Sequence, residues 1–331
     1  MKIMVYEARP DERADLENQA ALHGVELSVT DAVPTLENAS LAAGCIGVSI
    51  LGQGCIDAAL LDAYHALGIR YLSTRTIGYD HIDLDHARSI GLRVCSASYA
   101  PNGVADFTVM MILMCLRHYK QALWRGQVND FSLTGLQGRE MKDLTIGIIG
   151  TGRIGAQVAR NLSGFGCRIL AYDLRRNPAV EPQVTYVDFD TLLAQSDVIT
   201  LHMPLLDSNR HIINRESIAK MRDGVVIVNC SRGELADIEA LIEGIETGKI
   251  GALGMDTVEG DEGIIHADHR VDILPNRNWF YLHQFRNVIM TQHMAFYTDA
   301  AVSSMVDCGI GGICQMAAGE SCPTELTGPV Q

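Results

Sequence analysis

The 331-residue chain lacks the features that mark membrane, secreted and disordered proteins. Its longest apolar run, Val109–Leu116, is far shorter than the roughly 20 residues that a membrane-spanning helix needs. Charged residues follow the first apolar stretch at once, so the N-terminus does not match a secretory signal. With 47% apolar and 20% charged residues, the composition is typical of a globular protein, and the length predicts two domains.

An excess of positive charge is also missing. The chain has 26 Lys and Arg residues against 40 Asp and Glu residues, and its net charge is −14. We therefore expect neither a nucleic-acid partner nor a membrane partner, because both present negative phosphate groups. A small anionic substrate remains compatible with this charge, since one arginine can dominate the field inside a pocket.

Closely paired cysteines are absent. The nine cysteines are scattered without a CxxC motif, which argues against a disulfide framework and against a zinc site. His266 and His269 form an HxxH motif in a polar segment without a further ligand set, so we expect no metal site. Scattered reduced thiols are typical of a cytoplasmic protein, and we expect that location.

Short β-branched runs alternate with helical stretches, a pattern typical of parallel βαβ units. Near the start, the sequence predicts three strands and a helix over Asp57–Ala66. The later part predicts six strands with intervening helices, which fit a doubly wound dinucleotide-binding sheet. The predicted strands are Lys2–Tyr6, Gly47–Leu51, Tyr71–Ser73, Leu144–Ile149, Arg168–Tyr172, Val198–His202, Val225–Asn229, Gly251–Asp256 and Val288–Thr291.

Val104–Arg117 is apolar almost all round, which predicts a helix that is buried on most faces. Its methionines Met110, Met111 and Met114 are expected to pack in the core. Pro101 and Gly103 precede this helix, and we expect the chain to cross there into the second domain.

The tail after Thr298 is expected to be helical and to return to the first domain. The first domain is then discontinuous and consists of residues 1–100 plus 299–331. The second domain covers residues 101–298.

Gly150, Gly152 and Gly155 form a GxGxxG motif between a predicted strand and a predicted helix. In that context the glycines allow a tight turn, a close approach of the backbone to a pyrophosphate and close packing of helix on strand. Asp173 ends the next predicted strand, where an acidic residue binds a ribose 2′-hydroxyl and disfavours a 2′-phosphate. These residues favour NAD over NADP. Two alternatives remain open: the glycines could form a tight turn that binds no ligand, and Asp173 could cap a helix or turn. Arg175 and Arg176 lie close by and could bind a 2′-phosphate, so NADP also remains open as the cofactor.

Charged residues follow three later strands of the same predicted sheet. Arg232 lies beyond one strand end, a cluster of four carboxylates from Asp256 to Glu262 follows the next, and His293 follows the last. An arginine can clamp a carboxylate, and a histidine held by a carboxylate can act as an acid or base. Together the three positions suit hydride transfer to a 2-oxo acid. Surface ion pairs, a solvated acidic loop and a structural histidine are the alternatives.

Along nearly its whole length, the sequence contains segments that resemble those of the D-isomer-specific 2-hydroxyacid dehydrogenases, in the same order. The resemblance includes STRTIGYDHIDLDHA, SYAPNGVADFTVMMILM, GIIGTGRIG, LHMPL, VNCSRGELAD, GMDTVEGDEG and QHMAFYTDAA. Within the family the chain is most similar to the D-lactate dehydrogenase branch, in particular to the enzymes of vancomycin-resistance clusters. The resemblance implies two Rossmann-like, doubly wound α/β domains with the active site in the cleft between them, a substrate domain and an NAD-binding domain. It also implies a homodimer, with Val104–Arg117 as a candidate contact.

The resemblance also implies roles for individual residues. Arg232 binds the substrate carboxylate, His293 gives a proton to the carbonyl oxygen, and Asp261 pairs with His293 as the third catalytic residue. The implied substrate-binding residues are Leu51, Ile77, Gly78, Tyr99, Arg232 and His293. The implied cofactor-binding residues are Gly150, Gly152, Arg153, Ile154, Gly155, Asp173, Met203, Pro204, Asn209, Cys230, Ser231, Arg232 and Asp256.

Two departures from the family pattern bear on activity. The partner of the histidine is usually the second glutamate of an EGE-like triplet, and here that position is Asp261, one methylene shorter. Asp261 or Glu262 could pair with His293, and a weaker pair predicts that reduction fades at lower pH than in relatives. Leu51 stands where fermentative enzymes often have tyrosine, and with Gly52 it leaves more room for the substrate's side chain.

Pyruvate reduction to D-lactate is the expected reaction. A dehydrogenase for a bulkier acid, such as 2-oxoisocaproate or phenylpyruvate, is the first alternative. A binding protein that senses NADH, as in the C-terminal-binding corepressors, is the second. Turnover separates these classes, because a sensor binds NADH without oxidising much of it.

Overall fold

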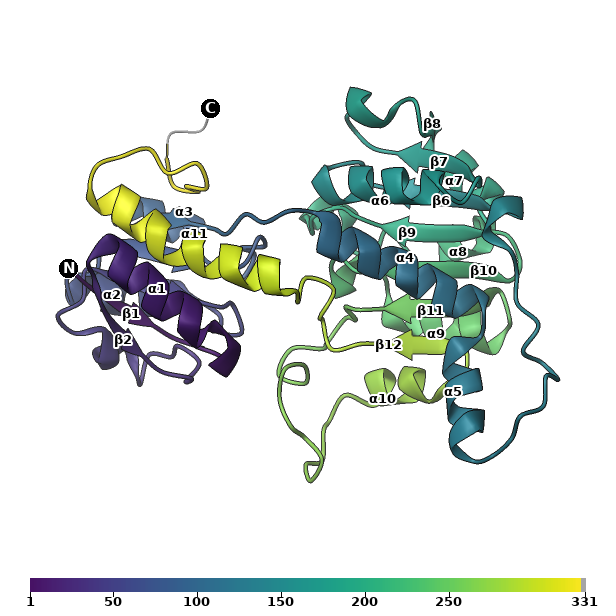
Figure 1. Cartoon of the computed structure of the whole chain (residues 1–331), viewed down its shortest axis with the longest axis horizontal. Helices are drawn as coiled ribbons and strands as arrows, with labels where there is room; N and C mark the ends of the chain where they lie inside the picture. Colours follow the sequence, from purple (N-terminus) through teal and green to yellow (C-terminus); the bar gives the residue numbers. More distant parts are fainter. Residues whose placement is uncertain (329–331) are drawn as a thin grey trace. The chain divides into compact units, whose positions relative to one another are not determined.

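The N-terminal part of the chain forms a five-stranded parallel sheet with the order β2-β1-β3-β4-β5. The computed structural model describes residues 1–328 and divides into two units, one made of Met1–Ala100 with the segment from Tyr297 on, the other of Pro101–Phe296 (Figure 1). The elements of the first unit are β1 (Lys2–Val5), α1 (Arg13–His23), β2 (Glu26–Val29), β3 (Gly47–Ile50), α2 (Ala58–Ala66), β4 (Tyr71–Thr74), α3 (Leu84–Ser89), β5 (Arg93–Cys95) and α11 (Asp299–Ala317).

The tail of the chain belongs to the packing of this first unit. Helix α11 contacts α1 and β4, and Thr298 caps its first turn by accepting from the Ala301 N–H. By length and composition α11 could cross a membrane, but 56% of its most apolar window is buried, as in the core helix of a globular domain. Beyond it, the Leu326 N–H donates to the Val94 carbonyl, so the last described segment pairs with β5.

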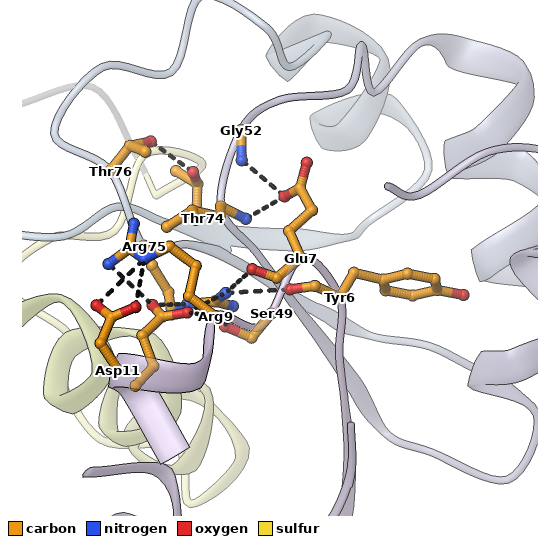
Figure 2. Close-up of polar contacts among 11 residues, drawn as sticks. Tyr6, Glu7, Arg9, Asp11, Ser49, Gly52, Thr74, Arg75 and Thr76 are labelled. Atoms are coloured by element: carbon orange, nitrogen blue, oxygen red, sulfur yellow. Dashed lines mark hydrogen bonds and ion pairs between the residues drawn. The ribbon is translucent and has the colours of Figure 1, made fainter. Parts of the chain in front are cut away.

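A buried ion pair joins strand ends in this sheet. Arg75, directly after β4, is fully buried and donates from Nε to Glu12 Oε1 at 3.0 Å, and Glu12 is fully buried as well (Figure 2). Its other nitrogens donate to the main-chain carbonyls of Tyr6 and Glu7, after β1, and to the hydroxyl of Ser49 in β3. A buried charge is tolerated only when it is paired and hydrogen-bonded, and removal of one partner typically costs about 3–5 kcal/mol. Arg75 therefore fixes the carboxyl ends of three neighbouring strands.

The second unit is a seven-stranded parallel sheet with the order β12-β11-β10-β9-β6-β7-β8. In Figure 1, α4 and α6 lie across one face of this sheet, with α8 and α9 behind it. The strands are β6 (Thr145–Ile149), β7 (Arg168–Tyr172), β8 (Thr185–Tyr186), β9 (Val198–Leu201), β10 (Val225–Asn229), β11 (Ile250–Met255) and β12 (Val288–Met290). The helices are α4 (Asn102–Leu116), α5 (Tyr119–Gln127), α6 (Arg153–Ser163), α7 (Phe189–Gln195), α8 (Arg215–Lys220), α9 (Ile238–Glu246) and α10 (Arg277–Gln284).

Both sheets confirm the predicted α/β class with parallel strands, and the strand order of the second is that of a doubly wound dinucleotide-binding fold. From β6 the strands are added in one direction as far as β8, and from β9 they are added in the opposite direction as far as β12. The strand order therefore reverses between β6 and β9, and ligands bind outside the carboxyl ends of the strands at such a point. Three strands escaped the sequence prediction: β2, which is largely exposed, the three-residue β5 and the two-residue β8.

The prediction that all three methionines of α4 pack in the core is wrong in part. Met111 is fully buried, but Met110 is 42% exposed. One face of α4 packs on α6, β10 and β11, and the opposite face is left with Val109, Met110, Leu113 and Met114 along an open groove. The apolar character of this helix therefore reflects two surfaces, of which only one is covered within the chain.

Candidate active site

The loop after β6 has the geometry of a phosphate-binding turn. Gly150 adopts φ +92°, and a Cβ there would lie 2.6 Å from the His202 carbonyl oxygen. A Cβ on Gly155 would lie 2.0 Å from the Gly150 carbonyl oxygen, so this glycine permits close packing. Gly152 stands at the N-cap of α6 without a side-chain cap, and a Cβ there would meet nothing within 4 Å. The first N–H groups of α6, which include those of Arg153 and Ile154, can therefore face a pyrophosphate.

Asp173 follows β7, and its carboxylate holds the glycine loop. Its Oδ2 accepts from the N–H and the hydroxyl of Thr151, at 2.6 and 3.0 Å, and its Oδ1 accepts from the Arg175 N–H at 2.9 Å. The capping role that the sequence left open is thus present. A carboxylate has about four acceptor positions, so Asp173 retains capacity for a ribose hydroxyl. The Arg176 guanidinium lies over the ring of Tyr186, with 5.5 Å between carbon and centroid.

His202, at the end of β9, was not identified from the sequence. Burial lowers the pKa of its imidazole to about 3, so the ring is neutral at pH 7. One ring nitrogen, Nε2, pairs with the Thr200 hydroxyl at 2.9 Å, whereas the other, Nδ1, is buried without a hydrogen-bond partner in residues 1–328. The uncapped helix end, the carboxylate of Asp173 and this unpaired nitrogen fit a dinucleotide at the edge of the sheet.

Side chains after β9 and β10 fix the main chain at that edge. The Ser231 hydroxyl donates to the Met203 carbonyl at 2.6 Å, and the Asn209 amide donates to the Pro204 carbonyl at 2.8 Å. Both residues therefore brace the loop that carries Met203 and Pro204. Cys230 is buried, and burial raises the pKa of its thiol, which stays neutral at pH 7.

Asp256 connects the ends of β11 and β12. It is 1% exposed, and its Oδ1 accepts from the Thr291 hydroxyl at 2.5 Å and from the Met294 N–H at 2.9 Å. Its Oδ2 accepts from the Ala295 N–H at 2.8 Å. These bonds hold the chain on both sides of His293. His293 itself adopts φ 53°, a conformation that is uncommon outside glycine. Asp256, predicted as a cofactor ligand, therefore also positions the predicted proton donor.

The acidic residues that follow Asp256 make different contacts. Glu259 pairs with His211, with 2.6 Å between Oε1 and Nε2, a pairing that the sequence did not indicate because 48 residues separate the two. Asp261 Oδ2 accepts from the Val258 N–H at 3.1 Å, and Glu262 is exposed. Burial raises the pKa of Asp261 to about 6; the hydrogen bond from the Val258 N–H opposes the rise, and the neighbouring carboxylates of Glu262, Glu234 and Asp256 add to it. Pairing of Asp261 with His293 stays a prediction.

Arg232 lies three residues beyond β10, the strand next to β11. Its Nη1 donates to the Ser231 carbonyl at 2.9 Å, and its own carbonyl accepts from the Asn229 amide at 2.7 Å. Arg232, Asp256 and His293 thus follow three adjacent strands, β10, β11 and β12, at their carboxyl ends. This is the arrangement that the sequence predicts within the second unit.

The first unit brings its predicted substrate residues to one sheet edge as well. Leu51 follows β3, Ile77 and Gly78 follow β4, and Tyr99 follows β5, three adjacent strands. Within residues 1–328 the N–H groups of Ile77 and Gly78 donate to no acceptor, whereas the Thr76 hydroxyl donates to the Gly78 carbonyl at 2.6 Å. Two adjacent main-chain amides of this kind can bind a carboxylate.

Across the described residues, no group of three or more His, Cys, Asp or Glu side chains could hold a metal ion. All nine cysteines are free thiols.

We predict that Asp261→Asn stabilises the protein at neutral pH. Folding raises the pKa of this half-buried carboxyl from about 3.8 to about 6, so the folded state binds its proton more tightly than the unfolded state. That contribution is full below about pH 4 and disappears as pH rises through about 6. In urea unfolding, the variant should match wild type near pH 4 and exceed it by up to about 3 kcal/mol near pH 7.5.

Glu262→Gln is the matched control, because it removes the same charge from an exposed neighbour. Its unfolding free energy should equal that of wild type near pH 4 and exceed it near pH 7.5 by much less than that of Asp261→Asn, because burial is the largest cause of the raised pKa and the Glu262 charge is a smaller one. An Asp261→Asn difference that does not change with pH would contradict the assignment of a raised pKa.

The comparisons with known proteins agree with this geometry. The family model for the NAD-binding domain of D-isomer specific 2-hydroxyacid dehydrogenases matches residues 109–295. An aromatic 2-oxoacid reductase of Clostridium sporogenes is 42% identical over 311 residues, 93% of each chain. The apo-structure of D-lactate dehydrogenase from Escherichia coli superposes with a TM-score of 0.86 at 36% identity, covering 98% of this chain and 100% of that one.

A third similarity concerns the cofactor. The NAD-complexed D-isomer specific 2-hydroxyacid dehydrogenase from Lactobacillus delbrueckii ssp. bulgaricus gives a TM-score of 0.84 at 30% identity, covering 98% of this chain and 100% of that one. The site residues and these relatives lead to one conclusion: the chain belongs to the D-isomer-specific 2-hydroxyacid dehydrogenase family and is an NAD-dependent oxidoreductase that acts on CH–OH groups.

Proposed function

We propose that this enzyme reduces pyruvate to D-lactate, with Arg232 binding the substrate carboxylate and His293 giving a proton to the carbonyl oxygen. The observation that carries this proposal is the pair of bonds from Asp256 to the Met294 and Ala295 N–H groups, which holds the His293 segment at the edge where Arg232 also lies. NADH, when bound, supplies the hydride for the carbonyl carbon. Several relatives are named D-lactate dehydrogenases, including that of Escherichia coli at 36% identity.

The first unit is proposed as the substrate domain. The amides of Ile77 and Gly78 would bind a substrate carboxylate, and Leu51 and Tyr99 would contact the rest of the substrate.

A larger 2-oxo acid is the second candidate substrate. Leu51 and Gly52 provide a smaller lining than tyrosine at the same place, and the relative at 42% identity is named an aromatic 2-oxoacid reductase. One or two methylenes change binding by only about 1–3 kcal/mol in such a pocket, so both acids can be substrates of one enzyme.

Turnover of a panel of 2-oxo acids tests the function. We expect loss of NADH absorbance with pyruvate and formation of D-lactate, identified by chiral chromatography. A preference for phenylpyruvate or 2-oxoisocaproate would replace the first candidate by the second. NADH binding without oxidation by any of the acids would contradict the proposed reaction.

We also propose that the uncovered face of α4 pairs with a second copy of the chain. The groove there is lined by four apolar side chains and also by Asp106 and Arg117, so it offers both signs of charge beside apolar surface. Met110, at 42% exposure, lies among these side chains. A contiguous apolar face of this kind is typical of an interface, and a symmetric pair would cover two such faces at once.

Met110→Glu should convert the dimer to a monomer, because a buried interface does not accommodate two unpaired carboxylates. Light scattering coupled to size exclusion, at about micromolar concentration, measures the mass. Leu22→Glu, on the exposed side of α1 in the other unit, is the control and should leave the mass unchanged. A monomeric wild type, or a Met110→Glu variant of dimeric mass, would refute the pairing.

A further inference from the structure

The side chain of Glu7 occupies a ring of main-chain amides after β3. Its Oε2 accepts from the Leu51 N–H and, at 2.9 Å, from the Gly52 N–H (Figure 2). Its Oε1 accepts from the N–H groups of Gln53 and Gly54, at 2.8 and 3.2 Å. Four consecutive amides that converge on one carboxylate form an anion-binding concavity, and here the anion comes from the chain itself.

Glu7 is fixed in its own place by the fold. The residue is 3% exposed, and its main chain adopts φ 55°, a conformation that a non-glycine residue keeps only when its surroundings hold it. The Glu7 N–H donates to the Ala32 carbonyl at 3.1 Å, and its carbonyl accepts from Arg75 at 3.2 Å. The carboxylate is therefore a rigid anchor for the segment Leu51–Gly54.

That segment lies against the loop after β4. Gly52 adopts φ +88°, and a Cβ there would lie 3.0 Å from the His81 ring and 3.4 Å from Thr76 Cγ2. The Ile56 N–H donates to the His81 carbonyl at 2.8 Å, so the two loops are also joined through their main chains. A shift of Leu51–Gly54 would alter the space beside Thr76–Gly78, where the substrate carboxylate is proposed to bind.

We propose that Glu7 is a specificity-determining positioning residue: it sets the position of Leu51–Gly54 and thereby the size of the 2-oxo acid side chain that the enzyme accepts. This inference rests on the proposed function, in which Leu51 contacts the substrate's side chain. Glu7 itself does not touch the substrate. Its negative charge is matched by amides that would otherwise be unpaired, so an uncharged side chain cannot hold all four.

Glu7→Gln tests this inference, because glutamine keeps the length and turns an NH₂ group toward two of the amides. We expect KM to rise in proportion to the size of the substrate's side chain. It should change less than about twofold for glyoxylate, which has no side chain, and at least about tenfold for phenylpyruvate, with pyruvate between them. The dissociation constant of NADH, measured by fluorescence, should stay unchanged.

Glu12→Gln is the matched control, since Glu12 is an equally buried glutamate of the same sheet edge that bonds Arg75 and not the loop. It should lower the melting temperature and leave the ratio of KM values as in wild type. Where Glu7→Gln does not fold, Glu7→Asp carries the test. It retains the charge but cannot reach all four amides, and the same dependence on side-chain size should appear at smaller amplitude.

Equal changes for all three acids, or the same pattern in Glu12→Gln, would overturn the inference and leave Glu7 a purely structural residue. A wild-type enzyme that reduces none of the acids would instead overturn the proposed function. The two failures are therefore distinguishable.

Discussion

The carboxylate of Asp256 determines the geometry on which the proposed chemistry depends. It ends β11, is almost fully buried, and binds the Thr291 hydroxyl and the N–H groups of Met294 and Ala295. These bonds hold the turn at His293, which follows the short strand β12 and whose positive φ is unfavourable by itself. One buried carboxylate thus joins two adjacent strand ends and holds the main chain on both sides of His293.

The same physical device recurs at other loops. Asp173 binds the N–H groups of Thr151 and Arg175 beside the glycine loop, and Glu7 binds four amides after β3. In each case an acidic side chain accepts from main-chain amides that have no partner in a strand or helix, so the loop is rigid without losing the backbone approach that a ligand needs. Some of the acidic residues behind the net charge of −14 therefore bind main-chain amides inside the molecule and do not lie on its surface.

Much of the fold follows from the sequence because long β-branched runs mark the buried strands. β6, β7, β9 and β10 were predicted within a residue or two, whereas β2 and β8 carry too few buried side chains to produce a pattern.

The glycine motif and Asp173 were predictable since their spacing follows one strand-helix-strand unit. The pair of Glu259 and His211 was not, because no local pattern records a contact between loops 48 residues apart. The exposure of Met110 was not predicted for a related reason: hydropathy does not distinguish a core position from an exposed apolar face.

The most direct test of this account is the kinetic and binding behaviour of Asp256→Asn. If Asp256 acts by positioning His293, kcat at saturating NADH should fall by about 100-fold while the NADH dissociation constant changes less than about threefold. If Asp256 acts mainly as a cofactor ligand, NADH binding will weaken and kcat at saturation will be retained. That second result would contradict the central role assigned to its bonds with the His293 segment.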